Sequence, residues 1–137
     1  MQLYLCLVPH GAISGPVKSG LAKEITRLHV EATGAPAALI HVVFQELPVG
    51  AHFVAAKCDH KTSILFANFQ AARSEEVVPK LMKSISAAWT HLTGQPEQNL
   101  VMIFNEADGA AVAGLVPPQV GEEAAWLRGN QSAPLKQ

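Results

Sequence analysis

The feature that most constrains the fold of this chain is an internal repeat with a period of 60 residues. Between positions 14 and 46, ten residues are identical to the residue 60 positions later, and no gap is needed. The pairs are Ser14 and Ser74, Val17 and Val77, Leu21 and Leu81, Lys23 and Lys83, Ile25 and Ile85, Thr33 and Thr93, Gly34 and Gly94, Pro36 and Pro96, Phe44 and Phe104, and Glu46 and Glu106. These identities indicate one supersecondary unit used twice, over residues 2–46 and 62–106. We expect residues 1–137 to form a single domain with a C-terminal tail at 107–137.

Each unit is predicted to be a strand, a helix and a second strand. Ser14 and Ser74 are suited to capping the start of a helix, and Gly34 and Gly94 to ending it in the left-handed conformation. Apolar residues recur at helical spacing between these caps. The flanking segments 3–8, 39–46, 63–69 and 99–106 have the length and the β-branched and aromatic content of strands.

Two such units predict a two-layer α+β fold. Each strand-helix-strand unit is a right-handed parallel unit, so the pair gives a four-stranded sheet, mainly parallel within each unit, with both helices on one face. The strands are apolar throughout rather than alternating, so the other face is not expected to meet water. We therefore expect an obligate oligomer whose sheets meet. A short edge strand is expected at residues 52–56 of the linker.

Composition excludes several classes of protein. The chain has 10 basic and 11 acidic residues and a net charge of −1, which argues against a nucleic-acid or membrane-surface partner. The first apolar run is too short for a signal peptide or a membrane span. Cys6 and Cys58 fit reduced thiols rather than a disulfide framework. A cytoplasmic protein is expected.

Three segments resemble a known family. The stretches LAKEITRLHVEATG, VVFQELPVG and IFNEADG, within the duplicated unit, resemble the tautomerase superfamily and look most like its cis-3-chloroacrylic acid dehalogenase subgroup. The resemblance covers roughly residues 2–120. It implies a homotrimer with the sheets lining a barrel, a small carboxylate or 2-oxo (enol) acid as ligand, and no cofactor. It also implies an N-terminal proline whose secondary amine acts as base or acid.

The resemblance assigns the catalytic positions. Gln2 falls at the place of the family's proline, and His29 at the subgroup's helix histidine, which helps to position substrate or water. Met1 should be retained because Gln2 is large, so a primary amine precedes the strand. An apolar pocket would lower the pKa of such an amine and let Met1 act as a base. One added residue would, however, displace the nitrogen by about 3.3 Å and turn the next side chain to the other face of the strand.

The substrate-binding positions are altered. The subgroup's two arginines fall on Ala71 and Ser74, and Arg73, one residue away, is the guanidinium left to bind a carboxylate. The subgroup tyrosine falls on Ile103, which we retain as a substrate-binding position, and the water-activating glutamate falls near Ala111. Hydrolytic dehalogenation, which needs a carboxylate to activate water, is therefore not expected. Weak tautomerase or isomerase activity is one reading, and a catalytically inactive ligand-binding or structural trimer is the other.

Each candidate residue also has a simpler interpretation. His29 follows Ile25 by four residues and fits the end of a core stripe. Arg73 fits a solvated loop residue, and Gln2 a residue at the edge of a strand. Glu46 and Glu106, related by the repeat, look like paired carboxylates but fit structural roles at turns or subunit contacts better.

One further cluster suggests a metal. Residues 57–60 read KCDH, and they bring a cysteine, an aspartate and a histidine together. Because the chain has no second pair of ligands at a suitable spacing, no metal site is expected.

Overall fold

A computed structural model describes residues 1–70 and 76–107. In chain order its elements are β1 (Gln2–Pro9), α1 (Gly15–Thr33), the short 3₁₀ helix η1 (Ala37–Leu39), β2 (Ile40–Leu47), β3 (Phe53–Val54), β4 (Lys57–Cys58), β5 (Ser63–Gln70), α2 (Val77–Thr93), the 3₁₀ helix η2 (Glu97–Asn99) and β6 (Leu100–Ala107). The tail expected at 107–137 lies outside the described residues after position 107.

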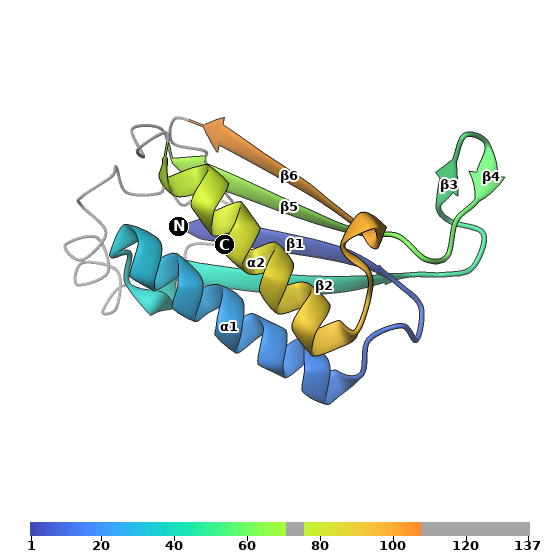
Figure 1. Cartoon of the computed structure of the whole chain (residues 1–137), viewed down its shortest axis with the longest axis horizontal. Helices are drawn as coiled ribbons and strands as arrows, with labels where there is room; N and C mark the ends of the chain where they lie inside the picture. Colours follow the sequence, from blue (N-terminus) through green and yellow to red (C-terminus); the bar gives the residue numbers. More distant parts are fainter. Residues whose placement is uncertain (71–75, 108–137) are drawn as a thin grey trace, which may run out of the picture.

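The predicted two-layer fold is confirmed. The four long strands form one sheet in the order β2-β1-β5-β6. β1 and β2 are parallel, β5 and β6 are parallel, and β1 and β5 are antiparallel at the centre. Both helices cover the same face of this sheet (Figure 1). The two repeats therefore run in opposite directions, and β1 and β5 begin at opposite ends of the sheet.

The helix ends follow the repeat. Ser14 caps α1, its Oγ accepting from the backbone N–H of Val17 at 3.3 Å. Gly34 and Gly94 end α1 and α2 with φ of 74° and 75°, a conformation that suits glycine because it lacks Cβ. At the start of α2 the N-cap position belongs to Glu76. Ser74, expected to be that cap, lies outside the described residues.

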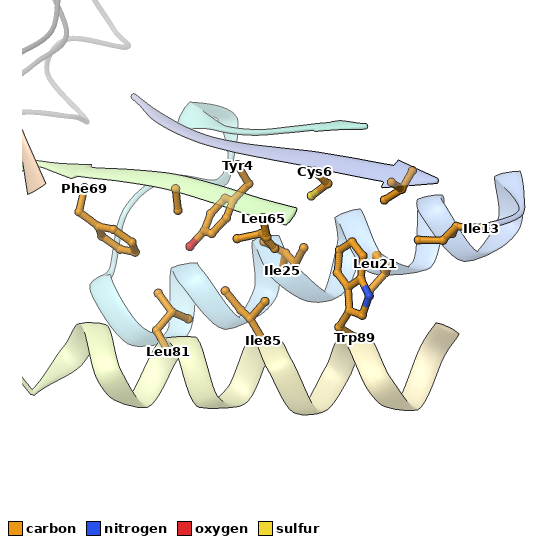
Figure 2. Packing of buried hydrophobic residues seen from close by; sticks show 12 residues of the cluster. Tyr4, Cys6, Ile13, Leu21, Ile25, Leu65, Phe69, Leu81, Ile85 and Trp89 are labelled. Carbon is orange, nitrogen blue, oxygen red and sulfur yellow. The ribbon is translucent and has the colours of Figure 1, made fainter. Parts of the chain in front are cut away.

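The core lies between the sheet and the helices. Alternate residues of the two central strands point into it, as strand geometry requires. Figure 2 shows Tyr4, Leu65 and Phe69 projecting from the sheet toward Leu81 and Ile85 of α2. The fully buried side chains of this cluster include Tyr4, Cys6, Val8, Leu21, Ile25, Leu65, Ile85 and Trp89.

The other face of the sheet is apolar, and no helix of the described part of the chain covers it. Because successive side chains of a strand point to opposite faces, the residues that alternate with the core residues along each strand point to this face. Register places Leu5 of β1 beside Val43 and Phe66, and Phe66 beside Ile103. Leu3, Val43, Val101 and Ile103 are exposed large hydrophobic residues.

The expected edge strand at 52–56 is wrong. Phe53–Val54 instead pairs with Lys57–Cys58 in a separate two-stranded hairpin, which projects from the end of the main sheet (Figure 1). Ala55 and Ala56 form its turn with φ of 51° and 65°. Two consecutive residues in this conformation reverse the chain tightly, so the segment folds on itself and cannot extend the sheet. In the part of the chain described here, no helix is both long and apolar enough to cross a membrane.

Candidate functional site

The start of β1 is where the resemblance places the chemistry. Met1 is half-buried, and β1 begins at Gln2. The Gln2 side chain is 6% exposed, and its Nε2 lies 3.5 Å from the carbonyl oxygen of Leu3, a long and weak contact. Gln2 lies on the same face of β1 as Tyr4, the face turned toward the helices. The residue in the proline's place thus points into the helix layer.

His29 lies in that same layer and bonds to β1. Its Nδ1 is 2.7 Å from Oη of Tyr4, and this hydrogen bond joins residues 25 positions apart. His29 is 1% exposed and Tyr4 is 0% exposed. The structure therefore brings His29 close to the start of β1, where it contacts Tyr4, two residues after Gln2. At this exposure, a ligand reaches His29 only if the residues that cover it move.

Aromatic rings surround the Tyr4–His29 pair. Phe69 of β5 stacks on His29 with a centroid distance of 5.4 Å and an interplanar angle of 25°. Phe104 of β6 stacks on Phe69 at 5.2 Å and meets Tyr4 edge-on at 6.2 Å. Phe69 and Phe104 come from strands of the second repeat, whereas Tyr4 and His29 belong to the first. The rings make an apolar environment in which a charged group is disfavoured.

The same environment changes the acidity of two β1 side chains. Burial, with a smaller contribution from Cys6, raises the pKa of the Tyr4 hydroxyl above its ordinary value. Burial raises the pKa of the Cys6 thiol to about 12. Both side chains are therefore uncharged at neutral pH, and Cys6 has no thiolate character.

The other predicted site residues do not join this cluster within one chain. Ile103 lies on the opposite face of the sheet and is 36% exposed. Arg73, with Ala71 and Ser74, lies outside the described residues, as does Ala111. The sheet thus separates Ile103 from His29.

Glu46 has the structural role that was predicted for it. Its Oε1 accepts from the backbone N–H of Gly11 at 2.7 Å, and Nζ of Lys18 lies 3.6 Å from its Oε2. The Gly11 hydrogen bond is the main reason that the pKa of Glu46 is lowered. Glu46 therefore fastens the loop after β1 to the end of β2. The side chain of Glu106 lies outside the described part.

The KCDH segment lies at the opposite end of the sheet from His29. A pocket of about 230 Å³ there is lined by His10, His52, His60 and Asp59, among others. Asp59 is engaged by the turn that follows it, accepting from the backbone N–H groups of Lys61 and Thr62 and from the Thr62 hydroxyl. Across residues 1–70 and 76–107, no three His, Cys, Asp or Glu side chains are grouped so that they could hold a metal.

Sequence reasoning missed Tyr4. It is the single tyrosine of the chain, and strand alternation from Gln2 could have placed it on the helix-facing side. Nothing local in the sequence shows that His29, on a different element, meets its hydroxyl. The contact depends on how α1 packs on β1.

Comparisons with known proteins agree with this fold. The family described as "Putative oxalocrotonate tautomerase enzyme" matches residues 1–131. A "Probable tautomerase" of Streptococcus pneumoniae serotype 4 is 44% identical over 36 residues, which are 26% of this chain and 60% of that relative. The chain thus spans less than two thirds of the length of this relative.

Two solved structures share the fold. One is N1, a member of the cis-3-chloroacrylic acid dehalogenase family, with a TM-score of 0.81 and 23% identity over 96% of this chain and 92% of that chain. The other is a fused 4-OT wild type asymmetric trimer, with a TM-score of 0.75 and 19% identity over 83% of this chain and 94% of that chain. Because the family match spans nearly the whole sequence, the chain belongs to the oxalocrotonate tautomerase family of the tautomerase superfamily.

Proposed function

We propose that this chain binds a small carboxylate or 2-oxo (enol) acid where β1 begins, and that it has weak tautomerase activity there. The reaction moves one proton from an enol oxygen to the carbon at the far end of the C=C bond and involves no net oxidation. One observation carries the proposal: in a member of the tautomerase family, a histidine is held by Tyr4 directly behind the start of the first strand.

Met1 is the base in this proposal. An apolar surrounding keeps the primary amine neutral. The amine takes the enol proton, becomes an ammonium group, and then gives the proton to the carbon. Gln2, next to it, supplies an amide for hydrogen bonds to the ligand. His29 provides a polar group in the helix layer behind Met1 and Gln2. Arg73, which lies beyond the described residues, would pair with the ligand carboxylate.

Three chains complete the proposed site. The uncovered apolar face of the sheet is best explained by sheet-to-sheet contact in a homotrimer, and a fused 4-OT neighbour with the same fold is a trimer. Ile103 lies on that face and would contact a ligand across the subunit boundary. With one buried and one exposed free cysteine among the described residues, we also propose a cytoplasmic location.

Ketonisation of phenylenolpyruvate tests this proposal. The wild-type rate is expected to exceed the buffer rate and to fall in His29→Ala, while Ser63→Ala, altered at the other end of the sheet, should retain it. Intact mass of the same sample establishes which residue carries the amine. A wild-type rate equal to that of buffer, unaltered by His29→Ala, would sink the enzymatic proposal.

The second candidate is a non-catalytic trimer that binds a small ligand or serves a structural role. Two observations favour it: Gln2 stands in the proline's place, and His29 is 1% exposed. It predicts that substitutions at His29 and Arg73 leave ligand binding unchanged. Strong thermal stabilisation of the wild type by an enolic substrate analogue, lost in Arg73→Ala, would count against it.

A further inference from the structure

Tyr4 and His29 form a hydrogen bond in the buried core, where water is not available as an alternative partner. Both side chains are buried, and Tyr4 Oη lies 2.7 Å from His29 Nδ1. A neutral imidazole has one donor nitrogen and one acceptor nitrogen. The bond therefore has two possible arrangements: Tyr4 donates to a bare Nδ1, or a protonated Nδ1 donates to Tyr4 Oη.

The surroundings of Tyr4 select the first arrangement. If Nδ1 carried the proton, the Tyr4 O–H would need another acceptor, and residues 1–70 and 76–107 offer its oxygen no hydrogen bond besides the one with His29. A buried O–H without an acceptor is strongly disfavoured. Burial also raises the pKa of Tyr4, so the proton stays on Oη at neutral pH. Tyr4 is accordingly the donor.

We propose that Tyr4 is a positioning residue whose hydroxyl holds His29 neutral, with the imidazole proton on Nε2. The inference rests on the proposed function, since it defines what His29 does at that site. With its Nδ1 lone pair engaged, His29 does not accept the enol proton. Its Nε2 then carries the hydrogen and can only donate, so the ring contributes an N–H donor and not a base. The role of base is left to the amine that precedes β1.

Within residues 1–70 and 76–107, the side chains packed against His29 support a neutral ring. The Phe69 ring stacks on it, and the Tyr4 ring meets it edge-on at 5.6 Å with an interplanar angle of 85°. Cys6, the next residue on the same face of β1, is uncharged because burial raises its pKa to about 12. On α1 itself, Arg27 and Glu31 lie on the exposed side and pair with each other at 2.7 Å. Aromatic packing of this kind also restricts rotation of the imidazole.

The histidine tautomer can be measured directly on the full chain. Two-bond ¹H–¹⁵N correlation spectra report which ring nitrogen carries hydrogen, and His29→Gln identifies the signals of His29 among the six histidines. At pH 7 the wild type is expected to show a bare Nδ1 and a protonated Nε2. Tyr4→Phe, which keeps the ring and removes the hydroxyl, is expected to shift the Nδ1 signal because this nitrogen loses its hydrogen-bond donor.

Ser63→Ala is the matched control. Ser63 is also fully buried, and its hydroxyl donates to Gln95 Oε1 at 3.2 Å, in the other repeat. This variant should lower stability as Tyr4→Phe does, yet leave the His29 signature unchanged. A general loosening of the core would alter the signature in both variants and would contradict the proposal.

Kinetics give the second readout. Tyr4→Phe is expected to lower kcat/KM for phenylenolpyruvate about tenfold, the effect of losing roughly one hydrogen bond. It should also add an ionisation to the pH profile that His29→Gln removes in the same background. A protonated Nδ1 in the wild type, or an unaltered signature in Tyr4→Phe, overturns the proposal. An inactive wild type refutes the proposed function instead, and the spectra still decide the role of Tyr4.

Discussion

His29 of α1 and Trp89 of α2 occupy equivalent positions, 60 residues apart, and bury different polar groups at opposite ends of one core. His29 bonds Tyr4, whereas Nε1 of Trp89 donates to Gln95 Oε1 at 2.9 Å. The hydroxyls of Thr33 and Thr93 donate to the carbonyl oxygens of His29 and Trp89 at 2.8 and 2.7 Å. The two repeats thus share the same helix-end geometry, but only the first repeat places an imidazole there.

Replacing Trp89 tests this division of roles. Trp89→Phe removes the bond to Gln95 and leaves space beside Phe44, which stacks on Trp89 at 6.4 Å. The free energy of unfolding is expected to fall by about 1–3 kcal/mol, measured with urea, while kcat for ketonisation is unchanged. Leu92→Ala, at a 36% exposed position of the same helix, should cost less than about 1 kcal/mol. Equal losses in the two variants would refute a structural role for the Trp89 bond.

Gly20 inside α1 and Gly34 at its C-cap should change the stability in opposite directions when each is replaced by alanine. A Cβ at Gly20 or at Gly34 would meet nothing within 4 Å, so neither replacement creates a clash. Gly20 lies inside the helix, where alanine is favoured by about 1 kcal/mol, so Gly20→Ala is expected to stabilise. Gly34 has φ of 74°, which costs a residue with a Cβ about 1 kcal/mol, so Gly34→Ala is expected to destabilise. Urea unfolding of both variants decides this, and a shift of the same sign in both would contradict it.

Much of the fold could be predicted because its signals are local. Ser14, Gly34 and Gly94 mark helix ends through their own backbone chemistry, and the identities between repeats extend one unit to the other. The segment at 52–56 was misjudged because its fate depends on Ala55 and Ala56 adopting positive φ, which alanine propensity does not indicate.

The candidate site was harder to derive because its parts come from separate elements. His29 could be named from the family resemblance, but its burial and its bond to Tyr4 follow from how α1 packs on β1. Phe69 and Phe104, which enclose the pair, come from the second repeat. Contacts of this kind depend on tertiary packing, which hydrophobic periodicity does not specify.

A charged side chain on the apolar face of the sheet should prevent the proposed trimer from forming. Ile103→Lys places an ammonium group among Leu5, Val43 and Phe66, where sheets are expected to meet in the trimer. We expect the variant to sediment as a monomer in analytical ultracentrifugation. Leu92→Lys has the same charge change and the same 36% exposure at its position, but it lies on α2, so it should remain a trimer. A trimeric Ile103→Lys protein would show that this face is not the interface.

Asp59 is expected to contribute stability only above acidic pH. The backbone N–H of Thr62 is the main cause that lowers the pKa of Asp59 from 3.8 to about 2, with Lys61 N–H and the Thr62 hydroxyl adding to it. A carboxyl with a lowered pKa in the folded state stabilises fully above its unfolded pKa, and this contribution is lost as pH falls through the folded value. The difference in urea stability between wild type and Asp59→Asn should therefore be constant from pH 7 to about 4 and shrink toward pH 2. Glu97→Gln, an exposed carboxylate replaced on η2, controls for loss of a negative charge. A difference for Asp59→Asn that is equally large at pH 7 and pH 2 would show that the turn does not depend on the ionised carboxylate.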